Sequence, residues 1–384
     1  MRYAESRRSV AVVAFSGLRL DEDERRIVNV LRSHGPRSRK DLATKLDMSA
    51  SKLTRLSGTL LAHGLIAESP GAEPMTPGRP AVPLCISPAA GYAVGAVVHR
   101  GLIEVALVDY AGGVIAHCSH PFEDPDPKAF ALRVMATMHE LAIAHRLLGW
   151  RLLGVGVGVP GAALSPDGAR RWTVDSLAAW RGVDLKALFE EQIGHDVWIE
   201  NDANAAALAE YYVGGLMRRC STAVVILLGH GIGAGIIVDG RILRGATASA
   251  GEVGSLYPVD QPRPSTLDLL STLRSEGCPI HSLLDFDVVT RGYEAVVARW
   301  VERAAHQIAP IINWGLAWID PGEFVISSPL PNRILTALVD RIDYGTMRIG
   351  DHVGTAPRIS VSTLEGSAAT LGAALLPIHA TTIG

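Results

Sequence analysis

The pattern of apolar residues at the start of the chain predicts three short helices followed by a strand. An acidic run opens the first helix, apolar residues follow at helical spacing, and Gly35-Pro36 ends it. A second helix follows Ser38 in a Ser-x-x-Asp capping box, and a third follows Ser49 and buries leucines on one face. Leu65 to Glu68 then has the composition of a strand. This order is typical of a winged helix-turn-helix domain.

The outward face of the third helix has side chains suited to base edges and phosphates in a major groove. A further arginine lies in the Pro-rich loop Thr76 to Pro80, where it either enters a minor groove or braces a linker. The predicted DNA contacts are Ser38, Ser49, Ser51, Lys52, Thr54, Arg55 and Arg79. A three-helix interaction module with a solvated basic face is the alternative interpretation.

The later part of the chain alternates β-rich and helical runs and predicts an α/β body. At its centre, the short β-rich run Asp196 to Ile199 is followed after Glu200 by Asn201, Asp202 and an alanine-rich run of high helix propensity. Asn201 and Asp202 therefore stand where a strand ends and a helix begins, which is where ligands bind in α/β folds. They either contact the hydroxyl groups of a ligand or simply cap the helix.

Three segments of the body resemble the ROK family, which contains sugar kinases and sugar-responsive repressors. Residues 199–210 resemble its sugar-site motif, residues 152–161 its G-I-G-x-P-G segment, and residues 250–255 its E-x-G-H motif. Ser176 stands where the family usually has an asparagine that touches sugar, and nearby Trp180 is either a stacking platform or a core residue. The resemblance implies a two-lobed, actin-like ATPase (ribonuclease H-like) body. The ligand contacts that it implies are Gly161, Ser176, Asn201, Asp202, Glu252 and Ser255.

The same resemblance argues against kinase activity. Val97 stands where the family's kinases have an aspartate that helps to hold a metal, and a valine cannot ligate Mg²⁺. His99 and Arg100 replace the following glycines, His230 replaces the hydroxyl residue of the second phosphate loop, and Ser328 stands in the loop near adenine. We therefore expect no catalytic residue; Asp202 would be the general base only in a kinase.

The family's zinc motif is also altered. Ser255 replaces its histidine, and the segment that follows lacks the cysteines that the resemblance would supply. The four cysteines of the chain are far apart, which argues against a clustered metal site and against a disulfide framework. We expect no metal and no cofactor.

Length and charge support a division into a DNA-binding part and a body. A chain of 384 residues predicts two or three domains. We expect an N-terminal arm at 1–20, the winged helix-turn-helix at 21–75, a linker at 76–90 and the two-lobed body at 91–384. Residues 1–85 contain 14 Lys and Arg against 9 Asp and Glu, whereas the remainder contains 22 against 30. A basic segment on an acidic body suggests contact with a polyanion.

The composition, with 48% hydrophobic and 20% charged residues, is that of a soluble globular protein. Neither a membrane helix nor a signal peptide is expected, so we expect a cytoplasmic protein. The sequence favours a homodimeric or tetrameric transcriptional regulator, acting as a repressor, that binds double-stranded operator DNA and a sugar or sugar-derived effector. Two alternatives stay open: a dimerising scaffold that has lost its ligand, and an ATP-dependent sugar kinase.

Overall fold

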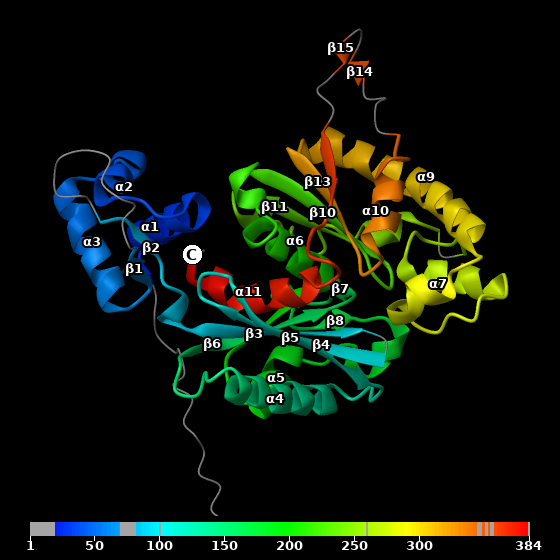
Figure 1. The fold of residues 1–384 in the computed structure, drawn as a ribbon, viewed down its shortest axis with the longest axis horizontal. Coiled ribbons are helices and arrows are strands. Elements are labelled where there is room, and N and C mark those ends of the chain that lie inside the picture. The colour runs from blue at the N-terminus through cyan, green and yellow to red at the C-terminus, as the bar shows by residue number, and fades with distance from the viewer. Residues whose placement is uncertain are drawn as a thin grey trace, which may run out of the picture.

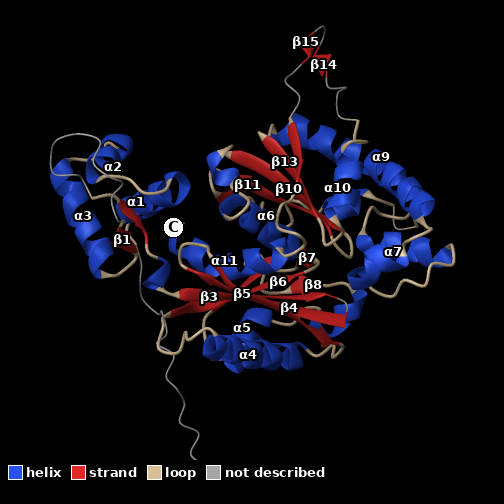
Figure 2. Ribbon diagram, viewed as in Figure 1, coloured by secondary structure: helices blue, strands red, loops and turns tan. Residues whose placement is uncertain are grey.

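The computed structural model describes residues 20–69, 82–99, 101–258, 260–343, 348–349, 352–353 and 357–382. It comprises a small N-terminal domain and a body of two lobes (Figures 1 and 2). Residues 1–19, which contain nearly all of the expected N-terminal arm, lie outside the described residues, as does Arg79 in the expected linker.

The N-terminal domain has three helices and a two-stranded antiparallel sheet. Its elements are α1 Glu22–His34, α2 Arg39–Leu46, α3 Ala50–Ala62, β1 Ile66–Glu68 and β2 Leu84–Ile86. Asp21 forms a complete capping box with Glu24 at the start of α1, and the hydroxyls of Ser38 and Ser49 accept hydrogen bonds at the starts of α2 and α3. Strand β2 pairs with β1 and falls inside the range expected to be linker.

The first lobe is a five-stranded sheet in the order β5-β4-β3-β6-β9. Its strands are β3 Tyr92–His99, β4 Gly101–Asp109, β5 Val114–Phe122, β6 Leu152–Val159 and β9 Val197–Asn201. Helices α4 and α5 cover one face of this sheet (Figure 2). They are α4 Pro127–Ala144 and α5 Leu185–Ile193, with the short elements η1 Pro88–Ala90, β7 Ala162–Ala163, β8 Arg171–Trp172 and η2 Asp175–Trp180 in the connections. Trp180 packs in the core against Phe130 and Phe189, so its interpretation as a core residue is the correct one.

The second lobe repeats this strand order as β12-β11-β10-β13-β16. In both sheets the first three strands along the chain pair antiparallel with one another. The fourth strand pairs parallel with the first, and the fifth pairs parallel with the fourth. The strands are β10 Thr222–Leu228, β11 Ile232–Val238, β12 Arg241–Ile242, β13 Glu323–Ser327 and β16 Arg358–Val361. The remaining small elements are η3 Leu216–Arg218, η4 Val253–Leu256, α7 Thr266–Ser275, η5 Leu283–Asp285, α8 Phe286–Val289, α10 Asn332–Val339, β14 Arg348–Ile349 and β15 His352–Val353. The long helix α9 Glu294–Ile319 continues through Pro310.

Two helices lie between the lobes. Helix α6 Asp202–Tyr212 packs on the second sheet, and α11 Ala368–Thr382 packs on β3 and β6 of the first (Figure 1). The two helices cross so closely that a Cβ atom at Gly372 would lie 1.6 Å from the carbonyl oxygen of Ala205. One continuous apolar cluster includes α6, α11 and the core of the N-terminal domain. The N-terminal domain is therefore packed on the body rather than tethered beside it.

Candidate functional site

The candidate site is built around the junction of β9 and α6. Asn201 ends the strand and Asp202 begins the helix, as the sequence pattern predicts. The Oδ1 atom of Asn201 accepts hydrogen bonds from the backbone N–H groups of Ala203, at 2.8 Å, and Asn204, at 3.3 Å. Asn201 therefore acts as a helix cap, and its Nδ2 atom faces the loop that follows β6.

Gly161 in that loop is fixed against the junction. Its carbonyl oxygen accepts hydrogen bonds from Nδ2 of Asn201, at 3.4 Å, and from Nη1 of Arg171, at 3.0 Å. Its φ is +112°, and a Cβ atom here would lie 2.2 Å from the carbonyl oxygen of Trp172. Only glycine suits this conformation and this close approach.

A group of charges around the buried carboxylate of Glu200 lies directly beside the β9–α6 junction, and no sequence pattern predicted it. Glu200 is contacted by Arg171, with Nη2 at 3.5 Å from its carboxylate, and by Arg244, with Nη2 at 2.8 Å. The Nδ2 atom of Asn204 donates to the same carboxylate at 3.0 Å. Burial lowers the pKa of Arg171, and the carboxylates of Glu200, Asp202 and Glu252 oppose that effect. The guanidinium of Arg171 thus offsets three neighbouring negative charges.

Glu252 completes the group from the second lobe. Burial raises the pKa of its carboxyl, Asp202 raises it further, and Arg171 opposes the shift. The charge of Asp202 therefore acts on Glu252 in the folded protein, although the two residues are fifty positions apart in the chain. Ser255 lies in the following turn, where its hydroxyl donates to the carbonyl oxygen of Glu252 at 2.7 Å.

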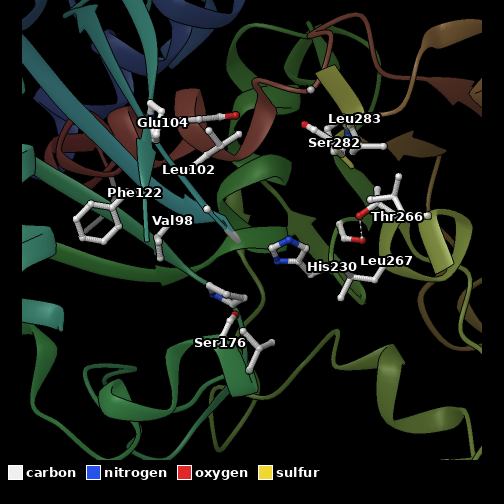
Figure 3. A pocket seen from close by; sticks show the side chains of 18 of the residues that line it. Val98, Leu102, Glu104, Phe122, Ser176, His230, Thr266, Leu267, Ser282 and Leu283 are labelled. Atoms are coloured by element: carbon white, nitrogen blue, oxygen red, sulfur yellow. Dashed lines mark hydrogen bonds between the residues drawn. The ribbon is translucent and has the colours of Figure 1, made fainter. Parts of the chain in front are cut away.

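Ser176 lies on the side of the site that opens between the lobes. It is exposed, and it lines a cavity of about 910 Å³ with Pro160, His230 and residues of both lobes (Figure 3). The structure thus places Gly161, Asn201, Asp202 and Glu252 together around Arg171, with Ser176 at the rim of the cavity and Ser255 behind Glu252.

Val97 stands beside the junction, in the place that the resemblance gives to an aspartate. A Cβ atom on Gly158 would lie 3.0 Å from Cγ2 of Val97 and 3.8 Å from Cα of Asp202, so Val97 and Asp202 flank the same glycine. Val97 is fully buried and offers no oxygen ligand there. The side chains of His99 and Arg100 lie outside the described residues. Within the described ranges, no three His, Cys, Asp or Glu side chains group closely enough to hold a metal ion.

The candidate DNA-binding face lies on α3. Ser51, Lys52, Thr54 and Arg55 are exposed, whereas the leucines of the same helix are buried. Lys52 forms an ion pair with Asp23 of α1, and the hydroxyl of Thr54 donates to the carbonyl of Ala50. Arg55 is therefore the side chain of this face best placed to reach outward.

The N-terminal domain meets the body through α1. Nη1 of Arg32 donates to the carbonyl oxygen of Tyr110 at 2.8 Å, and its guanidinium lies over the rings of Tyr110 and Tyr212. Asn29 donates to the carbonyl oxygen of Thr382 in α11 at 3.3 Å. Because Tyr212 is the last residue of α6, the helix that begins at the candidate site ends against the N-terminal domain.

Comparison with known proteins places the chain in a family. A family model described as "ROK family" matches residues 101–279. An uncharacterised protein, y4fQ of Sinorhizobium fredii, is 31% identical over 93% of this chain and 91% of its own length. The xylose repressor of Bacillus spizizenii is 26% identical over 61% of this chain, an alignment that covers 60% of the repressor. The chain belongs to the ROK family, and relatives within it are named as repressors.

Solved structures share the fold. A ROK family transcriptional regulator, a homologue of the Escherichia coli Mlc protein, superimposes with a TM-score of 0.71 at 20% identity, covering 94% of this chain and 96% of that one. A ROK family glucokinase from Streptomyces griseus, in complex with glucose and AMPPNP, has a TM-score of 0.59 at 21% identity and covers 74% of this chain and 99% of its own. The body is thus a ROK kinase-like fold preceded by a winged helix-turn-helix, as the sequence predicts. None of the described helices is long and apolar enough to span a membrane.

Proposed function

We propose that this protein is a DNA-binding transcriptional repressor whose operator affinity changes when a sugar or sugar-derived effector binds between the lobes of its body. The observation that carries the proposal is the path of α6. Its first residue, Asp202, belongs to the candidate ligand site, and its last, Tyr212, contacts Arg32 of the N-terminal domain. A ligand that moves α6 therefore moves a surface on which the DNA-binding domain rests.

The charges of the site suit a neutral, hydroxyl-rich ligand. Burial and the nearby carboxylate of Asp202 raise the pKa of Glu252, a cost of ionisation that hydrogen bonds from sugar hydroxyls would offset. A ligand shifts the equilibrium between open and closed lobes only by its different affinity for the two states. Glu252 lies on the second lobe and Asn201 on the first, so a ligand that contacts both favours the closed state.

The homo-oligomer belongs to the same proposal. A repressor dimer presents two α3 helices to two half-sites, which are spaced by about one turn of DNA or a multiple of it. A change in the position of the two N-terminal domains alters that spacing and therefore the affinity for the operator. We also propose that the exposed residues of α3 and Arg79 contact the operator DNA.

The test begins with selection of bound sequences from random double-stranded DNA by the full-length protein. Affinity for the selected sequence is then measured by fluorescence anisotropy at fixed salt, because phosphate contacts make it salt-dependent. Arg55→Ala should weaken specific binding by about 1–3 kcal/mol, whereas Arg291→Ala, which changes an exposed arginine of the body, should leave it unchanged. Failure to select any sequence, or equal binding by both variants, would contradict the proposal.

Kinase activity is the second candidate, because the fold is shared with a sugar kinase. Its test is hydrolysis or transfer from Mg-ATP in the presence of sugars. Turnover that is lost in Asp202→Asn would establish a kinase, and the position of Val97 beside Asp202 leads us to expect none.

A further inference from the structure

The cavity at the rim of the candidate site is larger than a single sugar ring requires. Its volume is about 910 Å³, near the upper end of the roughly 300–1,000 Å³ of pockets that hold drug-sized ligands. Val98, Leu102 and Phe122 line it from the first lobe, and Leu267 and Leu283 from the second (Figure 3). The hydroxyl-binding groups that we assign, apart from Ser176, lie outside this lining. A ligand that fills both regions needs one polar part and one apolar part.

The charges around the cavity disfavour a phosphate on that second part. Four carboxylates line it, those of Glu104, Glu123, Asp124 and Glu365. Among the described residues the lining guanidinium is that of Arg274, which already donates to the carbonyl oxygens of Ile280, at 2.8 Å, and His281, at 3.0 Å. An acidic wall repels a phosphorylated sugar or a nucleotide. An uncharged apolar group meets no such penalty.

Ser176 connects the two regions. It lines the cavity, and it stands where the family's sugar-binding asparagine is expected, fifteen residues after Gly161. Pro160, the residue before Gly161, lines the cavity as well. A substituent on a ring held at Asn201 and Glu252 thus has a direct way into the cavity.

From this arrangement we infer that the effector is a neutral sugar conjugate: a sugar ring at Asn201, Asp202 and Glu252, joined to an aromatic or alkyl group that occupies the cavity. The inference rests on the proposed function and names the chemical class of its effector. The apolar group contacts leucines of both lobes, so it adds affinity for the closed state beyond what the ring supplies.

The experiment is isothermal titration calorimetry of the full-length protein with matched pairs of ligands. Xylose, glucose and N-acetylglucosamine are each compared with their 4-nitrophenyl glycosides in both anomeric forms, with their phosphates, and with 4-nitrophenol alone. For one sugar we expect the nitrophenyl glycoside to bind at least tenfold more tightly than the parent, the phosphate to bind more weakly, and nitrophenol not to bind.

Two variants test whether the tighter binding of the nitrophenyl glycoside arises in the cavity. Leu267→Gln places an amide in the cavity at a partly exposed position and should remove most of the gain while leaving the parent sugar's affinity unchanged. Leu148→Gln changes a leucine that is 49% exposed outside the cavity lining and should retain the gain.

The outcomes separate this inference from the proposed function. A parent sugar that binds as tightly as its glycoside would overturn the inference and leave the sugar effector standing. A phosphate that binds more tightly than the neutral sugar would overturn the charge argument, and nitrophenol binding alone would remove the link to the ring. If no saccharide binds while Arg55-dependent operator binding persists, both this inference and the sugar effector fail, and the DNA-binding function remains.

Discussion

Arg32 of the N-terminal domain lies over the ring of Tyr212, with its guanidinium carbon 5.5 Å from the ring centroid. The same guanidinium lies 5.0 Å from the ring centroid of Tyr110 and donates to that residue's carbonyl oxygen. Tyr212 is partly buried, and its hydroxyl oxygen lies 2.9 Å from Nδ1 of His379. These contacts join the N-terminal domain to the first lobe, to α6 and to α11.

The pair of Arg32 and Tyr212 should be energetically coupled. We expect a double-mutant cycle with Arg32→Met and Tyr212→Leu to give a coupling energy of about 0.5–2 kcal/mol, because a partly desolvated cation lies over the ring. Urea denaturation of each variant supplies the measurement. The matched cycle of Arg55→Ala with Tyr212→Leu should be additive within about 0.5 kcal/mol, since Arg55 lies on the outward face of α3. Additivity in the first cycle would show that the contact carries no energy.

Alanine substitutions at Gly161 and Gly182 should separate the cost of a left-handed backbone from the cost of a steric clash. Both have positive φ, +112° and +72°, but only at Gly161 would a Cβ atom meet neighbouring backbone; at Gly182 nothing lies within 4 Å. Gly182→Ala should cost about 1–2 kcal/mol of unfolding free energy from its left-handed backbone. Gly161→Ala should cost clearly more and weaken sugar binding, because the loop must move away from Asn201. Equal losses in thermal and chemical denaturation would mean that the loop accommodates the methyl group.

Glu252 should make the protein less stable as the pH rises. Its pKa is raised in the folded protein, so above the ordinary value of 4.5 the folded state holds a proton that the unfolded state releases. The unfolding free energy therefore falls as pH rises through the folded pKa and stays lower at neutral pH. Glu252→Gln should raise the melting temperature at pH 7, and the difference should vanish below about pH 4.

Glu294 gives the matched control for that measurement. It is fully exposed, and hydrogen bonds from backbone N–H groups, that of Gly292 first, lower its pKa, so Glu294→Gln should not stabilise the protein at pH 7. A melting temperature of Glu252→Gln at or below that of the unchanged protein at pH 7 would argue that Glu252 is not penalised in the folded state.

His379 should have the opposite dependence on pH. Burial lowers its pKa to about 3 from an ordinary value of 6.5, and the nearby arginines 244, 32 and 241 contribute to the shift. Between these values the unfolded state binds a proton that the folded state does not. The stabilisation is complete above about pH 6.5 and is lost by up to about 1.4 kcal/mol per pH unit as the pH falls.

Replacing the imidazole should flatten that dependence. His379→Gln is expected to lose the part of the acid sensitivity that lies between about pH 6.5 and pH 3, as measured by urea denaturation across that range. His306→Gln changes a histidine whose side chain is 76% exposed on α9 and should leave the profile unchanged. A profile that is the same in both variants would exclude His379 as the source.

The fold and part of the site were predictable because their signals are local. Acidic residues, serines and glycines mark the starts and ends of the N-terminal helices, and the β-rich run before Asn201 changes to alanines directly after Asp202. Caps and periodicity act within a few residues, so they can be recognised in a sequence. The placement of Asn201 and Asp202 at a strand–helix junction is confirmed on this basis.

Arg171 could not be found in the same way. It lies in the two-residue strand β8, twenty-nine residues before Glu200 and seventy-three before Arg244, and no periodic pattern connects the three. The available signal was its position in a segment where the other motifs of the site occur, which is too weak to assign a role. The contact of α1 with α11 was likewise hidden, because Asn29 and Thr382 are separated by almost the whole chain.

The position of α11 has a consequence for how the protein is made. During synthesis the N-terminal domain emerges first, whereas the helix that it packs on emerges after all other described elements. The apolar core of the N-terminal domain is continuous with that of the body, and Asn29 cannot contact Thr382 until the ribosome has passed residue 382. The first sheet and α6 also lack the helix that packs on them until then. The nascent chain therefore passes through a stage in which the N-terminal domain is not yet packed on the complete body, and this packing is completed only when α11 closes against the rest.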